Sequence, residues 1–267
     1  MKLYLVRHGQ STGNVGGTLM GQSDHPLTEL GEEQARAAAA RLAPFGPMPL
    51  HCSDLPRAVA TAERILRAWA SPAGGGPVRA AGPDGDTPAP LRLLPDSRLR
   101  EIDLGDYEGR SWEEFEADEE LTAAFTDDPY GTALPGGESL AHLEARVMAA
   151  VADVLAAHGV RSAGDLSTDA VASSDASALA TGFHVAEPGD NACIVAHDGP
   201  IRAILNHYLG VPPERWWTLS TTHGGVSLLE FSGDWVNVRY VNATSHLAGL
   251  GDSVYVPSES DDAPADG

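Results

Sequence analysis

The chain opens with a short apolar stretch that ends on Arg7, His8 and Gly9. A neutral imidazole can act as a covalent nucleophile, and a guanidinium binds anions, with phosphate the best-matched one. Such chemistry needs partners from elsewhere in the chain. Matching side chains recur where other apolar stretches give way to polar residues, at Arg57, Glu101 and His197.

The elements expected around these residues alternate between strands and helices. Short apolar runs predict strands at 2–6, 50–53, 91–95 and 191–197, and a hairpin at 226–241. Helical spacing and end signals predict helices at 28–43, 54–70, 111–126, 137–158 and 199–210. This order predicts a three-layer α/β/α fold with a mostly parallel central sheet and an antiparallel edge strand.

In such a fold the candidate residues meet in one place, because the carboxyl ends of parallel strands gather at one crevice. Arg7, Arg57 and a helix N-terminus there would form an anion pocket. The nearby cations would lower the pKa of His8 and favour its neutral, nucleophilic form at pH 7. The sequence therefore predicts a phosphate site with an imidazole inside it.

The candidate residues are expected to belong to one catalytic domain over residues 1–250, and composition predicts two interruptions in it and a tail after it. Ten of the twenty residues at 71–90 are Gly or Pro, and sixteen of the thirty at 161–190 are Ala, Ser or Asp. Both segments are expected to be flexible insertions. The segment 251–267 carries five acids and no base, which predicts a disordered acidic tail.

The formal net charge of −21 argues against nucleic-acid or anionic-membrane partners, but not against an anionic substrate. Cys52 and Cys193 lie in expected strands, which predicts buried free thiols in a reducing compartment. No apolar run approaches the roughly 20 residues of a bilayer span. The first residues also lack a signal-peptide layout, so the expected location is cytoplasmic.

Six blocks follow one another along the chain: LVRHGQSTGN, GQSDHPLTELG, SDLPRAVATAE, LREIDLGDYEG, PGGESLAHLEARV and VAHDGPIRAIL. Together they resemble the histidine phosphatase superfamily, specifically its phosphoglycerate-mutase-like branch and the broad-specificity phosphatase type. The resemblance covers most of the chain outside the insertions and the tail. It implies a metal-independent phosphatase without a cofactor, which hydrolyses phosphomonoesters of small metabolites through a phosphohistidine.

The resemblance also implies a role for each matched position. His8 would be the nucleophile, and Arg7, Arg57 and His197 would hold the phosphoryl group. Glu101 would protonate the leaving oxygen and later activate water. The implied substrate-binding residues are Asn14, Gly21, Gln10, Ser11 and Asp198.

Two positions depart from the common pattern of the branch. Met20 occupies a place where a small or amide residue is frequent, so a hydrogen bond to substrate would be missing there. Asp198 stands where glycine is common. In the acid-phosphatase branch an aspartate beside a histidine donates the proton, so Asp198 competes with Glu101 for that role. Glu101 is favoured because its whole block matches the phosphoglycerate-mutase-like branch.

Three further features lie outside these blocks. The acidic run from Glu113 to Glu120 predicts a solvated helix face, on a helix that would cover the mouth of the pocket. His223, beside two glycines, lies on a loop that could reach the site. The pair at 216–217, two tryptophans, is expected to pack a helix against the core.

Two other functions stay open at this point. A phosphoglycerate mutase would return the phosphoryl group to another hydroxyl, but the segment between Glu101 and PGGES is short and lacks the basic stretch usual in such mutases. A catalytically idle phosphate-ester binding module is disfavoured by the intact set of candidate residues. The resemblance allows a homodimer, and the sequence does not identify which phosphate ester is the substrate.

Overall fold

The computed structural model describes residues 1–71, 91–160, 191–233 and 235–250. The predicted insertions and the predicted tail therefore lie outside the described residues, except for Ser71. A six-stranded sheet in the order β3-β2-β4-β1-β5-β6 forms the centre of the structure. Its strands are β1 (Lys2–Arg7), β2 (Leu50–Cys52), β3 (Leu93–Pro95), β4 (Asn191–Ala196), β5 (Val226–Ser232) and β6 (Trp235–Ala243).

The four strands from β3 to β1 in this order are parallel to one another. The hairpin of β5 and β6 continues the sheet, with β5 antiparallel to β1 and β6 antiparallel to β5. The predicted mostly parallel sheet with an antiparallel edge is confirmed. The antiparallel part is two strands wide, because both strands of the predicted hairpin join the sheet.

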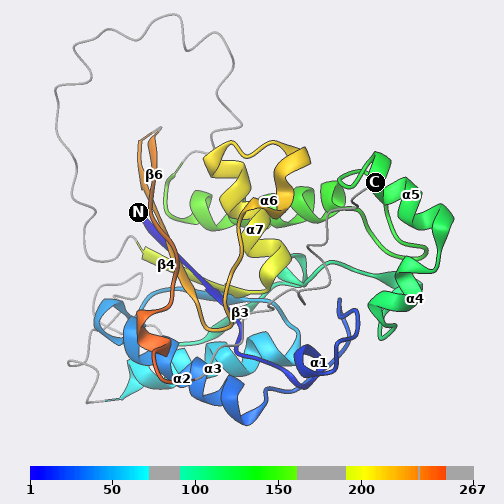
Figure 1. Cartoon of the computed structure of the whole chain (residues 1–267). Helices are drawn as coiled ribbons and strands as arrows, with labels where there is room; N and C mark the ends of the chain where they lie inside the picture. Colours follow the sequence, from blue (N-terminus) through cyan, green and yellow to red (C-terminus); the bar gives the residue numbers. More distant parts are fainter. Residues whose placement is uncertain (72–90, 161–190, 234, 251–267) are drawn as a thin grey trace, which may run out of the picture.

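Helices cover both faces of the sheet (Figure 1). The α-helices are α1 (Thr12–Val15), α2 (Glu29–Leu42), α3 (Pro56–Ala70), α4 (Trp112–Glu116), α5 (Glu119–Asp127), α6 (Leu140–Ala157) and α7 (Asp198–Leu209). Short 3-10 turns lie at Ala43–Phe45, Ser97–Leu99, Gly105–Tyr107, Pro213–Thr218 and Ser245–Leu247. One face packs against α2 and α3 and the other against α6 and α7, as the three-layer prediction requires.

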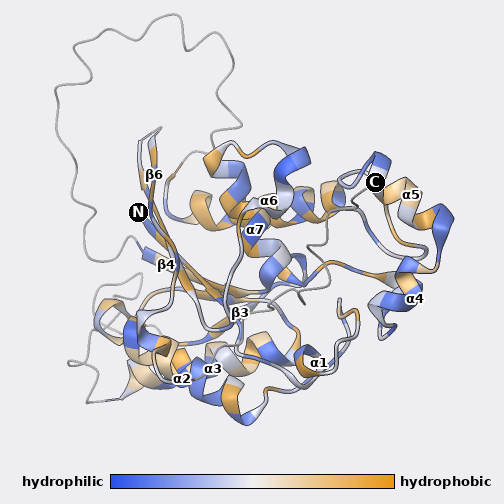
Figure 2. Cartoon of the chain, in the orientation of Figure 1, coloured by the Kyte–Doolittle hydropathy of each residue, from blue (hydrophilic) through white to orange (hydrophobic). Residues whose placement is uncertain are grey.

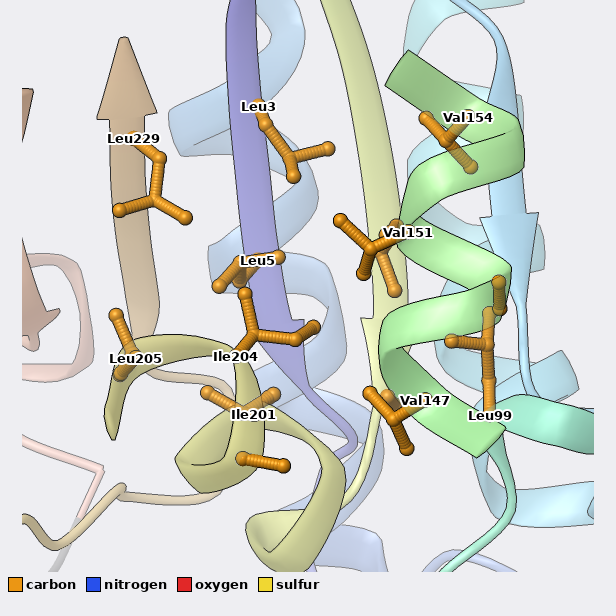
Figure 3. Packing of buried hydrophobic residues seen from close by; sticks show 14 of the residues in the cluster. Leu3, Leu5, Leu99, Val147, Val151, Val154, Ile201, Ile204, Leu205 and Leu229 are labelled. Carbon is orange, nitrogen blue, oxygen red and sulfur yellow. The ribbon is translucent and has the colours of Figure 1, made fainter. Parts of the chain in front are cut away.

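The alternation of side chains along β1 builds both cores at once. Leu3 and Leu5 belong to the cluster formed with α6 and α7, whereas Tyr4 and Val6 belong to the cluster formed with α2 and α3. Figure 3 shows the first cluster, in which the side chains of α6 and α7 meet those of β1. The hydropathy colouring of Figure 2 shows the central strands as largely apolar. Burial on both faces holds the carboxyl end of β1 in place.

The prediction of one helix over 111–126 is wrong, because the chain forms α4 and α5 with a break at Ala117 and Asp118. The Asp118 side chain accepts a hydrogen bond from the Leu121 N–H and starts a new helix. It also accepts one from the Tyr107 hydroxyl at 2.6 Å. Two other helices begin later than predicted, at Pro56 and at Leu140.

Two expectations from composition can be compared with the described residues. Cys52 and Cys193 are buried free thiols, as predicted. No helix in the described ranges has both the length and the apolar character needed to cross a bilayer.

Candidate active site

The carboxyl ends of β1, β2 and β4 bring the candidate residues together. His8 follows β1 and His197 follows β4, and the centroids of their rings lie 4.8 Å apart. Arg57, in the first turn of α3 after β2, donates from Nε to His197 Nδ1 at 3.3 Å. Residues separated by up to 190 positions therefore share one site, as the strand-end argument predicts.

The backbone fixes the tautomer of His8. Its Nδ1 lies 2.6 Å from the carbonyl oxygen of Gly9. A carbonyl oxygen only accepts hydrogen bonds, so Nδ1 carries the proton and Nε2 of the neutral ring keeps its lone pair. The free lone pair is the nucleophilic one.

The surroundings of His8 favour that neutral ring. His8 is 3% exposed, and burial is the main cause that holds its pKa well below the ordinary value of 6.5. The neighbouring His197, His223, Arg57 and Arg7 lower the pKa further. The imidazole is therefore unprotonated at neutral pH.

His197 has the opposite tautomer. Its Nδ1 accepts from Arg57, so the proton of the neutral ring sits on Nε2 and points to Ser53 Oγ, 2.8 Å away. Burial first, and then Arg57, lower the pKa of His197 well below its usual range. With both nitrogens engaged, His197 holds Arg57 in place. The expectation that it contacts a phosphoryl group directly stays a prediction.

Arg57 is 1% exposed and is clamped by backbone carbonyls. Its two terminal nitrogens donate to the carbonyls of Ser23 and Gly21, each at 2.7 Å. A guanidinium has five N–H donors, and three are used by these carbonyls and by His197. Two donors remain for an oxyanion in the cavity that Arg57 lines.

Arg7 reaches the same cavity from the end of β1. Its guanidinium donates to the Thr221 carbonyl and lies 3.7 Å from Asp198 Oδ1. The pair of arginines supplies fixed positive charge beside His8. This arrangement suits a phosphate group.

Glu101 has the protonation behaviour of a general acid. Its carboxylate lines the cavity and accepts from the N–H groups of Ile102 and Gly199. Burial, and secondly the charge of Asp198, raise the pKa of Glu101 above its usual 4.5. The protonated form therefore persists to higher pH than in a solvated glutamate.

Asp198 is held as a carboxylate instead. Burial opposes its charge, but Arg7 and Arg202 outweigh burial and lower the pKa of Asp198. Arg202 donates to Oδ2 at 2.6 Å and Thr221 donates to Oδ1 at 2.7 Å. Because a general acid must hold a proton, these contacts favour Glu101 over Asp198 for that role.

The cavity at these strand ends has a volume of about 640 Å³. It is lined by Arg7, His8, Asn14, Arg57, Glu101 and Asp198 among the predicted site residues, but not by Gln10, Ser11, Gly21 or His197. Met20, the departure noted in the sequence, also lines it. Its wall includes side chains of α4 and α5, and the expectation that this segment covers the mouth of the cavity stays a prediction.

The other predicted substrate residues support the wall from behind. Ser11 donates from its backbone N–H and its hydroxyl to Asn14 Oδ1, so the remaining polar group of Asn14 is a donor. Gln10 is tied to Thr28 and Gln34. Gly21 packs so closely on Glu108 and the Ile102 carbonyl that a Cβ atom would collide with both. Substrate contact by these residues stays a prediction.

Structure adds two residues to those that the sequence singled out. Ser53 directly follows β2, so the strand-end rule could have found it. Glu108 accepts from the backbone of Gly21, Gln22 and Ser23 and so holds the loop that clamps Arg57. No pattern in the sequence marks this role. His223, whose loop was expected within reach, has its ring centroid 5.5 Å from that of His8.

Trp216 and Trp217 behave differently. Trp216 is 2% exposed and packs in the core, as predicted for the pair. Trp217 is 65% exposed and lines the cavity, with the Arg202 guanidinium 5.0 Å from its ring centroid. In the described part of the chain, no group of three or more His, Cys, Asp or Glu residues is placed to hold a metal ion.

An imidazole whose Nε2 has no hydrogen-bond partner among the described residues shares a cavity with two arginines at the carboxyl edge of an α/β sheet, an arrangement suited to a phosphoryl group. The sequence comparison identifies the family. The chain matches the model of the histidine phosphatase superfamily (branch 1) over residues 3–74, 85–163 and 171–244. The chain belongs to this superfamily, and the resemblance inferred from the sequence is confirmed.

Several relatives share long stretches with the chain. Glucosyl-3-phosphoglycerate phosphatase of Mycobacterium tuberculosis is 30% identical over 234 residues, which cover 88% of this chain and 86% of the relative. A protein of Enterobacter sp. named "Probable phosphoglycerate mutase GpmB" is 35% identical over 156 residues, 58% of this chain and 63% of the relative.

Solved structures agree in fold. The mycobacterial glucosyl-3-phosphoglycerate phosphatase in complex with VO3 has a TM-score of 0.66 and 27% identity, and the match covers 91% of this chain and 99% of that one. Bacillus stearothermophilus YhfR has a TM-score of 0.67 at 23% identity, with 92% and 98% covered, and supports the fold alone.

Proposed function

We propose that this chain is a phosphatase that hydrolyses phosphomonoesters of small metabolites through a phosphohistidine on His8, without a metal. The observation that carries the proposal is the orientation of His8: its Nδ1–H is used by the Gly9 carbonyl, and its Nε2 is free in a cavity lined by Arg7 and Arg57. A relative that is named as a phosphatase supports the hydrolysis of a phosphate ester.

The first step would be attack of His8 Nε2 on the phosphorus. The bond from phosphorus to the ester oxygen breaks, and Glu101 gives its proton to the departing alcohol oxygen. Arg7 and the two remaining donors of Arg57 would stabilise the charge on the transferring group. His197 keeps Arg57 in position through its Nδ1.

In the second step Glu101 would act as a general base instead of a general acid. Its carboxylate, now without the proton, takes a proton from water as the water oxygen attacks the phosphohistidine. The bond between phosphorus and Nε2 breaks, and inorganic phosphate leaves. His8 returns to the neutral ring that its buried surroundings favour.

The test uses a ³²P-labelled monoester, with and without EDTA, and alkaline or acid quenching. We expect turnover to survive EDTA and the label on the protein to be stable to alkali but labile to acid. His8→Ala is expected to lose the label and at least about 10⁴-fold in kcat. His142→Ala is the matched control, because His142 is exposed and does not line the cavity.

Three results would contradict the proposal. Turnover that disappears in EDTA would remove the metal-independent chemistry. A label that remains on His8→Ala would show another nucleophile. Tight binding of phosphate esters without turnover by the unaltered chain would leave only a binding function.

A further inference from the structure

The cavity is divided into a charged end and an apolar end. The charged residues Arg7, Arg57, Glu101 and Asp198 line the cavity together with His8, where the proposed function puts the phosphoryl group. A second part of the wall is apolar: Leu19, Phe115 and Phe125 belong to one cluster, Trp112 packs against Phe115, and Met20 also lines the cavity. Trp217 lies over Arg202, which is hydrogen-bonded to Asp198, and so borders the charged part. The alcohol part of a bound ester would have to lie against this second end.

Exposed aromatic side chains line both parts of the cavity. Trp112 is 53% exposed and its ring meets that of Phe115 edge to face, with centroids 5.8 Å apart. Trp217 enters from the turn after α7 and is kept in place over Arg202. Large aromatic surfaces exposed at a cavity are free to stack on a flat or apolar ligand.

No cation lines the apolar end within the described residues. The wall has two arginines, both at the phosphoryl position, and Glu138 is the charged residue beyond them. Glu138 is itself held by Arg146 Nε at 2.9 Å. The outer faces of α4 and α5 add the exposed acids Glu113, Glu114, Glu116, Glu119 and Glu120.

A second anionic group on the substrate would therefore be costly. It would lose water against an apolar wall that, in the described part of the chain, supplies no cation as a partner. An uncharged aromatic or aliphatic group would bury its surface there and gain free energy in proportion to the area buried. Both effects favour an uncharged apolar group over an anionic group.

We propose that the site selects phosphate monoesters whose alcohol part is aromatic or apolar and carries no second negative charge. The inference rests on the proposed phosphatase function and names the substrate class of the same site. Phosphorylated hydroxy acids and bisphosphates are disfavoured by the same wall.

The test compares kcat/KM for ethyl phosphate, benzyl phosphate and 4-carboxybenzyl phosphate. The last two differ by one carboxylate placed far from the reacting oxygen. We expect benzyl phosphate to exceed ethyl phosphate by about tenfold or more, from burial of the ring. The carboxylated ester should fall about tenfold below benzyl phosphate. A carboxylated ester that is hydrolysed as well as benzyl phosphate would overturn the inference.

Substitutions of lining residues test which part of the cavity wall causes the preference for benzyl phosphate. Trp112→Ala and Phe125→Ala, both in the apolar part of the lining, should each lower the ratio of benzyl to ethyl phosphate by about threefold to tenfold. Trp235→Ala is the control, because Trp235 is 68% exposed but lies outside the cavity lining, and it should leave the ratio unchanged. A ratio that survives both cavity variants would overturn the assignment of these walls.

Failure of the inference can be told from failure of the proposed function. If all three esters are hydrolysed with equal kcat/KM, the phosphatase stands and the selectivity is wrong. If none of them, nor p-nitrophenyl phosphate, is hydrolysed, the function is wrong. Calorimetric binding of benzylphosphonate against 4-carboxybenzylphosphonate then still measures the selectivity, and equal affinities would overturn it.

Discussion

At the scale of single residues, two neighbouring histidines are given different tasks by the groups that hydrogen-bond to them. The Gly9 carbonyl can only accept, so it places the proton of His8 on Nδ1. The Arg57 guanidinium can only donate, so it places the proton of His197 on Nε2. Burial keeps the pKa of both rings low. One ring therefore presents a lone pair to the cavity and the other supports an arginine.

The carboxyl groups of Glu101 and Asp198 also differ in their tasks, because the surroundings favour the protonated form of Glu101 and the carboxylate form of Asp198. This difference predicts the effect of Glu101→Gln. Without a proton donor, kcat for benzyl phosphate should fall about 10²–10⁴-fold. p-Nitrophenolate leaves without protonation, so the first step on p-nitrophenyl phosphate should survive. Stopped-flow measurement should then show a burst of p-nitrophenolate followed by slow turnover, because water activation is lost.

The pH dependence of kcat provides a second test of the role of Glu101. The pKa of Glu101 is raised, so kcat for benzyl phosphate in the unaltered chain should decline as pH rises through it and the acid loses its proton. Asp198→Asn should keep this decline, because that carboxylate serves Arg7 and Arg202, but should move it to lower pH, because the charge of Asp198 helps to raise the pKa of Glu101. If Asp198→Asn removed the decline and Glu101→Gln kept it, the two roles would be reversed.

At the scale of elements, the placement of the site could be predicted from the sequence. Parallel strands end at one edge, so Arg7, His8, Arg57 and His197 had to converge once their strands were recognised. The break between α4 and α5 was missed, since helical composition continues through Asp118 and only the capping hydrogen bond reveals it. Propensity alone does not predict a cap inside a continuous helical run.

The loop that holds Arg57 was also beyond the reach of sequence patterns. Its function lies in the carbonyls of Gly21 and Ser23, and backbone carbonyls are the same in every residue type. The carboxylate that shapes this loop, Glu108, is 85 or more positions away in the chain. Periodicity and spacing describe neighbours along an element and carry no signal for such a contact.

Glu108→Gln is the prediction that belongs to this loop. Burial opposes the charge of Glu108, but hydrogen bonds from the Ser23 hydroxyl and the backbone of Gln22, Leu104 and Ser23 prevail and lower its pKa. An amide has one acceptor oxygen in place of two and adds two donors. The loop should loosen and release Arg57, so vanadate affinity and kcat should fall about tenfold to a hundredfold.

The pH dependence of kcat in Glu108→Gln distinguishes a role in positioning Arg57 from a general loss of structure. The pH at which kcat declines should stay that of the unaltered chain, because Glu101 is untouched. Glu113→Gln is the control, since Glu113 is exposed on α4 and does not line the cavity. Unchanged vanadate affinity in Glu108→Gln would show that Arg57 does not depend on this loop.

At the scale of the whole molecule, a strongly acidic chain surrounds a small cationic site. The sequence has 38 acidic residues against 17 lysines and arginines. Arg7 and Arg57 are largely buried in the cavity wall, so they lie close to a bound phosphate. In the described part of the chain, acids that do not line the cavity, such as Glu33, Asp153 and Glu214, are exposed on the surface. The two sets of charges act on the substrate over different distances.

A change of ionic strength should separate the effect of the surface acids on the substrate from that of Arg7 and Arg57. The Debye length falls from about 30 Å at 0.01 M to about 8 Å at 0.15 M salt, so salt removes the distant repulsion before the contacts of the arginines. We expect kcat/KM for benzyl phosphate to rise about twofold to fivefold over this range in sodium chloride. Sodium sulfate at equal ionic strength should raise it less, because sulfate competes for the phosphate position. A steady decline in sodium chloride would mean that the long-range field attracts the substrate, and that the arginines outweigh the net charge of −21 even at a distance.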